Sequence, residues 1–482
     1  MHEKSFEKRI STGISGFDEL LYGGLIPHHG YLVRGEAGVG KTILGLHFLT
    51  AGVKSGEQVL YISLQESENS LRNNAERVGI DTSDINFLDL STPSEFFTKV
   101  ESYQLFTPGQ VDSQPITKCI IETVTRLKPT RVFVDPITLF RYLSVDVFHF
   151  RKQVISFLAF LIEQGATVLI SSEISRDTPD DDLKVCVDGI FKLEHLCEQR
   201  TVQIEKMRGT DFVDKTNSLK ITNKGMIVFP HLLPTLRERR EIILNKIVTG
   251  VPGIDDLLKG GFAQGSTTLI SGPSGVGKTT IGSLFIKTAA LNNDRAVIFS
   301  FEVNTTLIIR RLEELGLDAA TLIEKRKLSI RKVEAFGFSP DEFTQVIRHE
   351  VEVNNTRIIL LDSVTGFNVA LGTDHLVYRL HEIGTYLQSM GVVLIIIAET
   401  TNIVESLQVS DIGISYFVDN IVFLRYIEIN GELRKVIGVL KKRFSDFEKT
   451  LREFEITSDG VKVGQPLHNL RGVITGIPEF LE

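Results

Sequence analysis

Gly35-Glu-Ala-Gly-Val-Gly-Lys41-Thr42 recurs as Gly272-Pro-Ser-Gly-Val-Gly-Lys278-Thr279, and the two lysines are 237 residues apart. Each copy follows a short apolar run and precedes a helical pattern. Glycine lets backbone N–H groups turn inward around an anion, and the following helix presents its positive end. The octapeptide therefore predicts one phosphate-binding loop in each half of the chain.

Each loop supplies the groups that a nucleoside triphosphate needs. Lys41 and Lys278 can reach the β- and γ-phosphates and assist catalysis, and Thr42 and Thr279 offer a hydroxyl to Mg²⁺. We therefore expect ATP and Mg²⁺ as ligands. The expected nucleotide-binding residues are Gly38, Val39, Gly40, Lys41, Thr42, Ile43, Ser274, Gly275, Val276, Gly277, Lys278, Thr279 and Thr280.

An aspartate follows a later apolar run in each half. Residues 132–134 lead into Asp135, and residues 358–361 lead into Asp362. A carboxylate at the carboxyl end of a parallel strand lies beside the phosphate loop and can hold the metal. We expect Asp135 and Asp362 to bind Mg²⁺ with the two threonines, although an aspartate that only caps a turn has the same pattern.

Hydrolysis also needs a base that orients water. The candidates follow the next apolar run after each loop, as Gln65-Glu66 in the first half and Glu302-Val303 in the second. Glu66 and Glu302 are the predicted catalytic carboxylates, and Glu302 is also a possible Mg²⁺ ligand. The alternative is that both are surface acids at the start of a helix, where acids are favoured.

The rest of the chain repeats as well. Residues 12–21, which begin Thr-Gly-Ile-Ser-Gly-Phe-Asp, return at 249–258, and Lys206-Met-Arg208 returns as Lys441-Lys-Arg443. Two homologous domains follow, residues 1–235 and 236–482. The charged, proline-containing stretch between them is expected to be a solvated linker, and residues 475–478 look like the opening of a third repeat that stops, suited to an exposed tail or docking peptide.

Short apolar runs alternate with helical patterns in each half. This alternation predicts an α/β fold with a mainly parallel sheet flanked by helices. The expected strands include residues 31–34, 58–64, 131–134, 166–171, 268–271, 392–398 and 420–424. The expected helices include residues 43–49, 70–78, 150–163 and 281–286.

Composition restricts the class of ligand and the cellular compartment that we expect. The formal net charge is −8, which disfavours a general nucleic-acid binder because phosphate contacts need basic surface. The three cysteines, Cys119, Cys186 and Cys197, match no metal site or disulfide framework. No signal peptide or membrane span is expected. We therefore expect a cytoplasmic protein, whose reducing surroundings would keep the three thiols reduced.

These motifs together resemble the KaiC family of tandem RecA-like P-loop NTPases, over nearly the whole chain. The resemblance implies a homohexamer of two rings with ATP at each subunit interface, slow ATP hydrolysis in the first ring and, in the clock proteins, autokinase activity in the second. It also implies that one segment of each half reaches a neighbour's nucleotide. The residues it assigns to these contacts in trans are Lys206, Met207, Arg208, Thr210, Lys441 and Arg443. On the sequence alone, Lys206 and Arg208 are equally well explained as alternate residues on one face of a strand.

The sequence also departs from the family pattern. Gln65 and Val303 each replace one glutamate of an adjacent pair, and Phe444 stands where the family has glycine. The clock phosphosites align with Ser415 and Tyr416. Ser415 is the possible phosphosite, but the simpler interpretation, which we favour slightly, is an ordinary residue near the start of the strand at 420–424.

Three hypotheses remain. The first is an oligomeric ATPase that acts as a nucleotide-dependent signalling or timing scaffold with a signalling protein as partner. The second is a Ser/Thr autokinase with Glu302 as base and Ser415 as acceptor. The third is a RecA-like DNA-dependent ATPase, which the acidic balance disfavours, since Lys441-Lys442-Arg443 is too short to reverse it.

Overall fold

The chain forms two compact units, Met1–Pro230 and His231–Glu482. The computed structural model describes residues 9–91, 115–144, 146–174, 179–196, 199–232, 246–334, 337–371, 376–400, 413–429, 431–457, 460–468, 470–473 and 479–480. The predicted boundary between residues 235 and 236 lies outside the described residues. So do Cys197, the charged run at 237–240 and the third repeat opening at 475–478.

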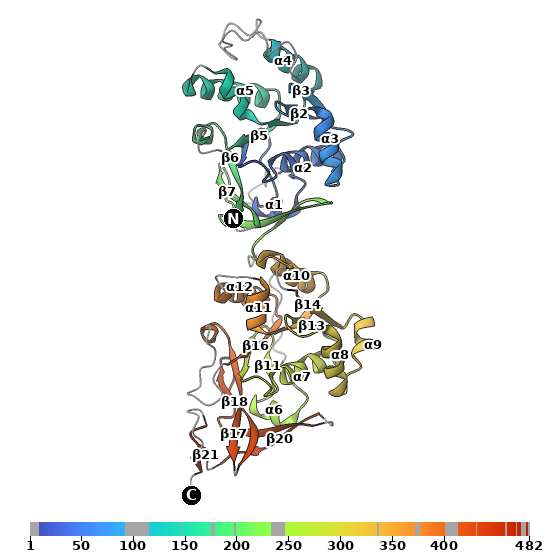
Figure 1. Ribbon diagram of the computed structural model, residues 1–482, viewed down its shortest axis with the longest axis vertical. Helices are drawn as coiled ribbons and strands as arrows, with labels where there is room; N and C mark the ends of the chain where they lie inside the picture. The colour runs from blue at the N-terminus through green and yellow to red at the C-terminus, as the bar shows by residue number, and fades with distance from the viewer. Residues whose placement is uncertain are drawn as a thin grey trace, which may run out of the picture. The chain divides into compact units, whose positions relative to one another are not determined.

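Unit 1 is built on one nine-stranded sheet in the order β3-β2-β4-β5-β1-β6-β7-β8-β9 (Figure 1). Its strands are β1 (Gly30–Gly35), β2 (Val59–Ser63), β3 (Asn86–Asp89), β4 (Arg131–Asp135), β5 (Thr167–Glu173), β6 (Gly189–Leu196), β7 (Gln199–Met207), β8 (Asn217–Thr222) and β9 (Gly225–Phe229). Its helices are α1 (Ser15–Leu20), α2 (Lys41–Lys54), α3 (Glu68–Arg77), α4 (Pro115–Leu127), α5 (Val147–Glu163) and the 3₁₀ helices η2 (Ile137–Leu143) and η3 (Asp181–Val185).

Unit 2 repeats this sheet in the order β14-β13-β15-β16-β12-β17-β18-β19-β20 and has two further two-stranded sheets, β10-β11 and β21-β22. Its strands are β10 (Lys246–Ile247), β11 (Phe262–Ala263), β12 (Thr267–Gly272), β13 (Arg295–Ser300), β14 (Leu328–Lys332), β15 (Thr356–Asp362), β16 (Val393–Glu399), β17 (Asn420–Ile429), β18 (Glu432–Lys442), β19 (Arg452–Thr457), β20 (Gly460–Pro466), β21 (Leu470–Arg471) and β22 (Glu479–Phe480). Its helices are α6 (Pro252–Leu257), α7 (Lys278–Leu291), α8 (Thr305–Glu314), α9 (Ala319–Glu324), α10 (Pro340–Glu352), α11 (Val364–Leu371), α12 (Leu376–Ser389) and the 3₁₀ helix η4 (Ile414–Tyr416).

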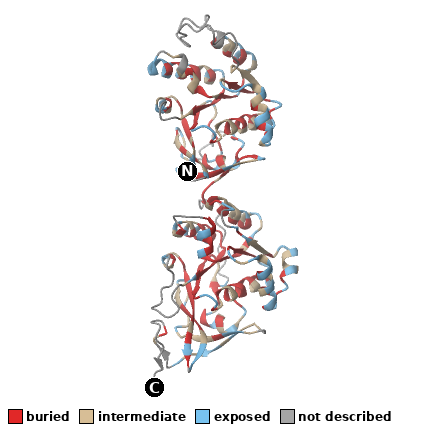
Figure 2. Ribbon diagram, in the orientation of Figure 1, coloured by how far each residue is buried: buried red, intermediate tan, exposed pale blue. Residues whose placement is uncertain are grey.

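The predicted fold class is confirmed in both units. The six strands from β3 to β6 pair in parallel, and the last strands of each sheet pair antiparallel. Alternate residues of the parallel strands face opposite sides, so Leu32 and Val33 enter different apolar clusters. One cluster packs α1 to α3 on the sheet and the other packs α4 and α5, which leaves the strands buried on both faces (Figure 2).

Several helices begin earlier than their sequence patterns indicated. α2 starts at Lys41 and α7 at Lys278, because Gly40 and Gly277 take left-handed backbone angles (φ 111° and 116°) and act as the N-caps. α5 starts at Val147, since its N-cap Asp146 accepts a hydrogen bond from the backbone N–H of His149. Caps rather than apolar periodicity set these ends.

Two further observations concern the described residues. Cys119 and Cys186 are free thiols. None of the helices in the described part of the chain has the length and apolar character needed to cross a bilayer.

Candidate functional site

The phosphate loop of unit 1 connects β1 to α2. Gly38 and Gly40 both have positive φ, which turns the loop back on itself before the helix begins. The Nζ of Lys41 donates to the carbonyls of Gly35 (2.8 Å) and Glu36 (2.7 Å). Val39 is buried, so only its backbone N–H is available to a phosphate. The loop is thus folded around the place that an anion would take.

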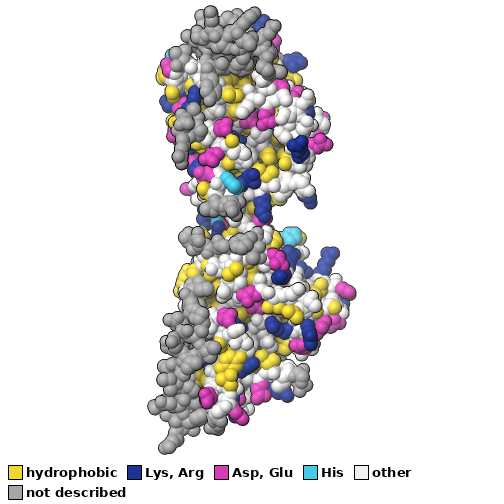
Figure 3. Space-filling model, in the orientation of Figure 1, with side chains coloured by type: hydrophobic (Ala, Val, Ile, Leu, Met, Phe, Trp, Pro, Cys, Tyr) yellow, Lys and Arg dark blue, Asp and Glu magenta, His cyan; other side chains and the backbone are white. Residues whose placement is uncertain are grey.

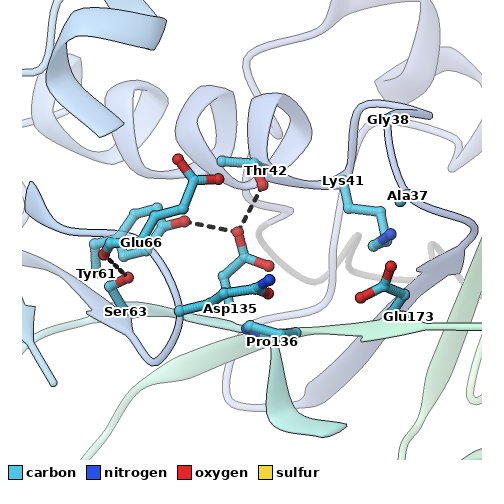
Figure 4. Close-up of a pocket in the computed structure, with 11 residues that line it drawn as sticks. Ala37, Gly38, Lys41, Thr42, Tyr61, Ser63, Glu66, Asp135, Pro136 and Glu173 are labelled. Carbon is cyan, nitrogen blue, oxygen red and sulfur yellow. Dashed lines mark hydrogen bonds between the residues drawn. The ribbon is translucent and has the colours of Figure 1, made fainter. Parts of the chain in front are cut away.

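Thr42 closes the site against the carboxyl end of β4. Its Oγ1 donates to Oδ2 of Asp135 at 2.6 Å, and the hydroxyl of Tyr61 on β2 donates to the same oxygen at 2.7 Å. The hydroxyl of Ser171 on β5 donates to the other carboxylate oxygen. Figure 4 shows Thr42 and Tyr61 converging on Asp135. The structure therefore brings together the two residues predicted to hold Mg²⁺.

Lys41 lies on the opposite side of this pocket beside Glu173, the last residue of β5 (Figure 4). Burial lowers the pKa of the Lys41 ammonium, and the negative charges of Glu173 and Asp135 oppose that effect. Sequence analysis missed Glu173 and its counterpart Glu399. The available signal was that both strands paired with the loop strand, β5 and β16, end in glutamate.

Two adjoining cavities open at the unit 1 loop. One of about 170 Å³ contains Asp135, Glu66 and Glu173. The other, of about 570 Å³, shares Lys41 and Thr42 with the first. Its lining includes Ile43, Leu46, Leu71, Arg77, Arg200 and Ile221. The first cavity is mainly polar, and the second is lined by both apolar and charged side chains, which is typical of a small-molecule site.

Unit 2 repeats the loop geometry. Gly275 and Gly277 have positive φ, Lys278 donates to the carbonyl of Pro273 (2.8 Å), and Thr279 Oγ1 donates to Asp362 Oδ2 (2.9 Å). A cavity of about 260 Å³ is lined by Ser274, Gly275, Gly277, Lys278, Thr279, Thr280, Glu302, Val303, Arg311, Asp362, Ser363, Ile397, Glu399 and Ile456. Val276 is fully buried and presents only its backbone.

The two aspartates have different surroundings. In unit 2 the positions of Tyr61 and Ser171 are occupied by Ile298 and Ile397, as the matching strand registers show. Among the described residues, only Thr279 donates a side-chain hydrogen bond to Asp362. Burial raises the pKa of the Asp362 carboxyl, and the hydrogen bond from Thr279 opposes this rise. Asp362, with one hydrogen-bond donor, should therefore be stabilised more by a bound cation than Asp135, which has three donors.

The two candidate catalytic glutamates are also held differently. Glu66 accepts from the side chains of Ser70 (3.2 Å) and Asn74 (3.3 Å) on α3. Glu302 accepts from Ser363 Oγ (2.6 Å), the residue after the metal-site aspartate. Neither glutamate lies in a helix, because the N-caps Ser67 and Asn304 follow them. Both are exposed and lie within two residues of a helix N-cap, so the alternative of a surface acid at a helix start stands beside the catalytic prediction.

The segments expected to act in trans lie at the other end of each sheet. β7 ends at Met207, which pairs with Gly189 on β6, and Gly189 pairs with Tyr31 near the start of β1. The phosphate loop, in contrast, follows the end of β1. In unit 2, β18 ends opposite Asn420 at the start of β17 in the same way. Neither segment can contact the phosphate loop of its own unit.

These segments are built alike. Lys206 Nζ donates to the carbonyls of Lys184 and Val187, and Lys441 Nζ donates to those of Ser415 and Val418. A β-bulge precedes each lysine. It shifts the pairing register between Ile190 and Phe191 on the strand opposite Lys206, and between Ile421 and Val422 on the strand opposite Lys441. The bulge lies before Lys206 and not between Lys206 and Arg208, so the alternative that these are alternate residues on one face of the strand stands.

The remaining trans residues differ in exposure. The side chains of Arg208 and Arg443 are about half exposed (59% and 49%) and lie 3.4 and 3.5 Å from Asp188 and Asp419. Thr210 accepts a hydrogen bond from Arg9 (2.6 Å). Met207 is buried in the core, so its side chain cannot contact a ligand; only its backbone remains.

The candidate phosphosite lies in the same region. Ser415 is part of η4, just before β17, and is half-buried, while Tyr416 and Phe444 are exposed. Its carbonyl accepts from Lys441 (3.0 Å), so Ser415 lies beside the segment expected to act in trans. Ser415 is thus far from the phosphate loop of unit 2 within one chain.

Comparison with known proteins agrees with this geometry. The family described as "ATPase: KaiC" matches residues 10–232 and 247–468. The chain is 27% identical to the circadian clock oscillator protein KaiC of Parasynechococcus marenigrum (98% of this chain, 93% of that protein) and 28% identical to that of a Nostoc species (98% and 92%). It is 27% identical to the circadian clock protein KaiC3 of a Synechocystis species (98% and 95%).

Proposed function

This chain belongs to the KaiC family of ATPases, and from that premise we propose that each unit binds one ATP and that the two sites do different work. The protein acts as a nucleotide-dependent signalling or timing scaffold, with slow hydrolysis in unit 1 and a signalling protein as partner. The observation that carries the proposal is the paired loop geometry. In both units a P-loop threonine donates to an aspartate at the end of the neighbouring strand.

The donor set fits Mg²⁺. A hydroxyl and a carboxylate oxygen meet in each unit, and Mg²⁺ prefers oxygen ligands, taking one or two carboxylates together with substrate phosphates. The described residues contain no group of three or more His, Cys, Asp or Glu side chains that could hold a metal by themselves. We propose that Thr42 with Asp135, and Thr279 with Asp362, hold a nucleotide-bound Mg²⁺ that neutralises phosphate charge.

The position of the trans segments supports assembly into a ring. Lys206 and Arg208 lie one strand length away from the phosphate loop of their own unit, so a nucleotide that they contact would not be the one at that loop. Cations supplied in trans stabilise charge on a transferring phosphoryl group. We propose a homohexamer with ATP at the subunit interfaces, as the family resemblance implies.

The direct test is ATP hydrolysis by the full chain. Lys41→Ala removes the ammonium that faces the phosphates of unit 1, so hydrolysis should fall by at least about 100-fold. Lys278→Ala should leave most of the hydrolysis intact. The reverse pattern would assign hydrolysis to unit 2, and unchanged hydrolysis in the double variant would refute the proposed sites.

An autokinase is the second candidate, because the carbonyl of Ser415 accepts from Lys441 and that of Tyr416 accepts from Arg443, at the edge expected to face a neighbour's nucleotide. Glu302 would accept the hydroxyl proton. Incubation with γ-labelled ATP followed by phosphosite mapping tests this candidate, with Ser415→Ala as the control. The candidate predicts label at Ser415 that Glu302→Gln abolishes, and absence of label at and around Ser415 would eliminate it.

A further inference from the structure

Arg311 lies on α8 and lines the phosphate cavity of unit 2 together with Lys278, Thr279 and Asp362. Neither the phosphate-loop motif nor the trans segment includes it. Its guanidinium is close enough to Asp362 that its charge opposes the rise in the pKa of that carboxyl caused by burial. Arg311 therefore faces the place where the proposed Mg²⁺ and terminal phosphates would lie.

The guanidinium has no competing partner in the described part of the chain, where no hydrogen bond or ion pair reaches it. Its sequence neighbour shows the contrast. Arg310 is largely exposed (76%) and lies 3.3 Å from Glu314 in an ion pair on the outer face of the same helix. Arginine carries five N–H donors in a planar fork that matches phosphate oxygens. A half-buried arginine in a phosphate cavity is available for that contact.

In the described part of unit 1, the position equivalent to Arg311 carries no charged group. α3 and α8 begin and end at matching positions, so Asn74 occupies the place of Arg311. The Asn74 amide is neutral and donates to Glu66 (3.3 Å). Arg77 and Arg200, like Asn74 itself, line the adjoining larger cavity and not the one that contains Asp135.

We propose that Arg311 contacts the terminal phosphate of the nucleotide in unit 2, which makes that site prefer ATP over ADP more strongly than the site in unit 1. This inference rests on the proposed function, since it requires a nucleotide in unit 2. The physical reason is the difference in charge between the ligands. The terminal phosphate of ATP would accept charge-assisted hydrogen bonds from the Arg311 guanidinium. ADP lacks that phosphate and would make no such contact.

The test measures nucleotide affinity in the full chain with Lys41→Ala, which removes the unit 1 site. Titration with a non-hydrolysable fluorescent ATP analogue and with the matching ADP analogue gives a ratio of dissociation constants. Arg311→Asn copies unit 1 and should reduce the preference for the ATP analogue about tenfold, the value of one charge-assisted hydrogen bond. Arg311→Lys should retain part of it, and the matched control Arg310→Asn should leave the ratio unchanged.

The outcomes separate the two levels of the proposal. If Arg311→Asn weakens both analogues equally, or neither, Arg311 only balances the charge of Asp362 and the inference is wrong while the nucleotide site stands. If the Lys41→Ala protein binds neither analogue, the proposed function of unit 2 fails, and the inference fails with it. The reciprocal variant Asn74→Arg, made with Lys278→Ala, should raise the ATP preference of unit 1.

Discussion

At the residue scale, Asp135 shows which parts of the site can be predicted. The sequence indicated the pairing of Thr42 with Asp135, because the loop motif and an apolar run ending in aspartate are local signals. Tyr61 and Ser171 were not predictable, since both are ordinary strand residues until the order β2-β4-β5 places them beside Asp135. Arg311 was missed for the same reason: its role depends on which face of α8 meets the sheet.

His47 on α2 is a second residue that differs between the units. The backbone N–H of Met226 donates to its Nε2 (2.8 Å), and burial lowers the pKa of His47 from its ordinary value of 6.5 to about 4. The equivalent residue of unit 2 is Leu284, as the matching bounds of α2 and α7 show. Acid should therefore weaken unit 1 through a group that unit 2 lacks.

The sign follows from proton binding. The unfolded chain takes up a proton at His47 below about pH 6.5, whereas the folded unit resists it until about pH 4. The contribution of His47 to the unfolding free energy of unit 1 is complete above pH 6.5. It is lost as the pH falls toward 4, by at most about 3 kcal/mol. Thermal unfolding between pH 7 and 4.5 should show unit 1 losing stability, with a smaller loss in His47→Gln. Identical pH slopes for the two proteins would contradict the assignment.

At the element scale, the apolar runs and helical patterns predicted the parallel strands and their helices, but not the sheet order or the four-stranded antiparallel extension of each sheet. Antiparallel pairing of β6 to β9 depends on cross-strand register, which no local signal specifies. That extension carries the bulge before Lys206, so the placement of the trans segment was not predictable either. The family resemblance, and not periodicity, indicated its role.

The contact of α2 with β4 gives the prediction at this scale. A Cβ added at Gly45 would lie 2.1 to 2.3 Å from the ring of Phe133, whereas at the equivalent Gly282 the nearest atom is Cδ1 of Leu360 at 3.0 Å. The rigid ring cannot move aside, but a leucine methyl can shift. Gly45→Ala should lower the unfolding free energy of unit 1 by about 2 kcal/mol or more.

Gly282→Ala is the matched control and should change stability by less than about 1 kcal/mol, because the gain in helix propensity offsets the mild crowding. Calorimetry of each full-length variant measures both effects. Equal destabilisation by the two substitutions would show that the helices pack on their sheets with the same spacing.

At the scale of the whole molecule, each unit presents a phosphate loop at one end of its sheet and a cationic segment at the other. If the cationic segments contact nucleotide, as proposed, each site is completed by assembly with another subunit. Basic and acidic side chains of the described residues are mixed on the face of each unit that Figure 3 shows.

Assembly should therefore depend on nucleotide. The mass of the protein in solution should increase from one chain to six when ATP and Mg²⁺ are added, and Arg208→Ala should weaken that increase because its cation is then missing from the shared site. Lys118→Ala, which removes an exposed lysine on α4 (67%), is the control and should assemble normally. Analytical ultracentrifugation measures this, and a single-chain mass with and without ATP would contradict the ring.

The central claim is that one chain binds two nucleotides at separate, unequal sites. The most direct measurement is the number of non-hydrolysable ATP analogues bound per chain at saturation, by equilibrium dialysis with Mg²⁺. The account predicts two for the unmodified protein, one for Lys41→Ala, one for Lys278→Ala and none for the double variant. One nucleotide per chain in the unmodified protein, or two in either single variant, would contradict it.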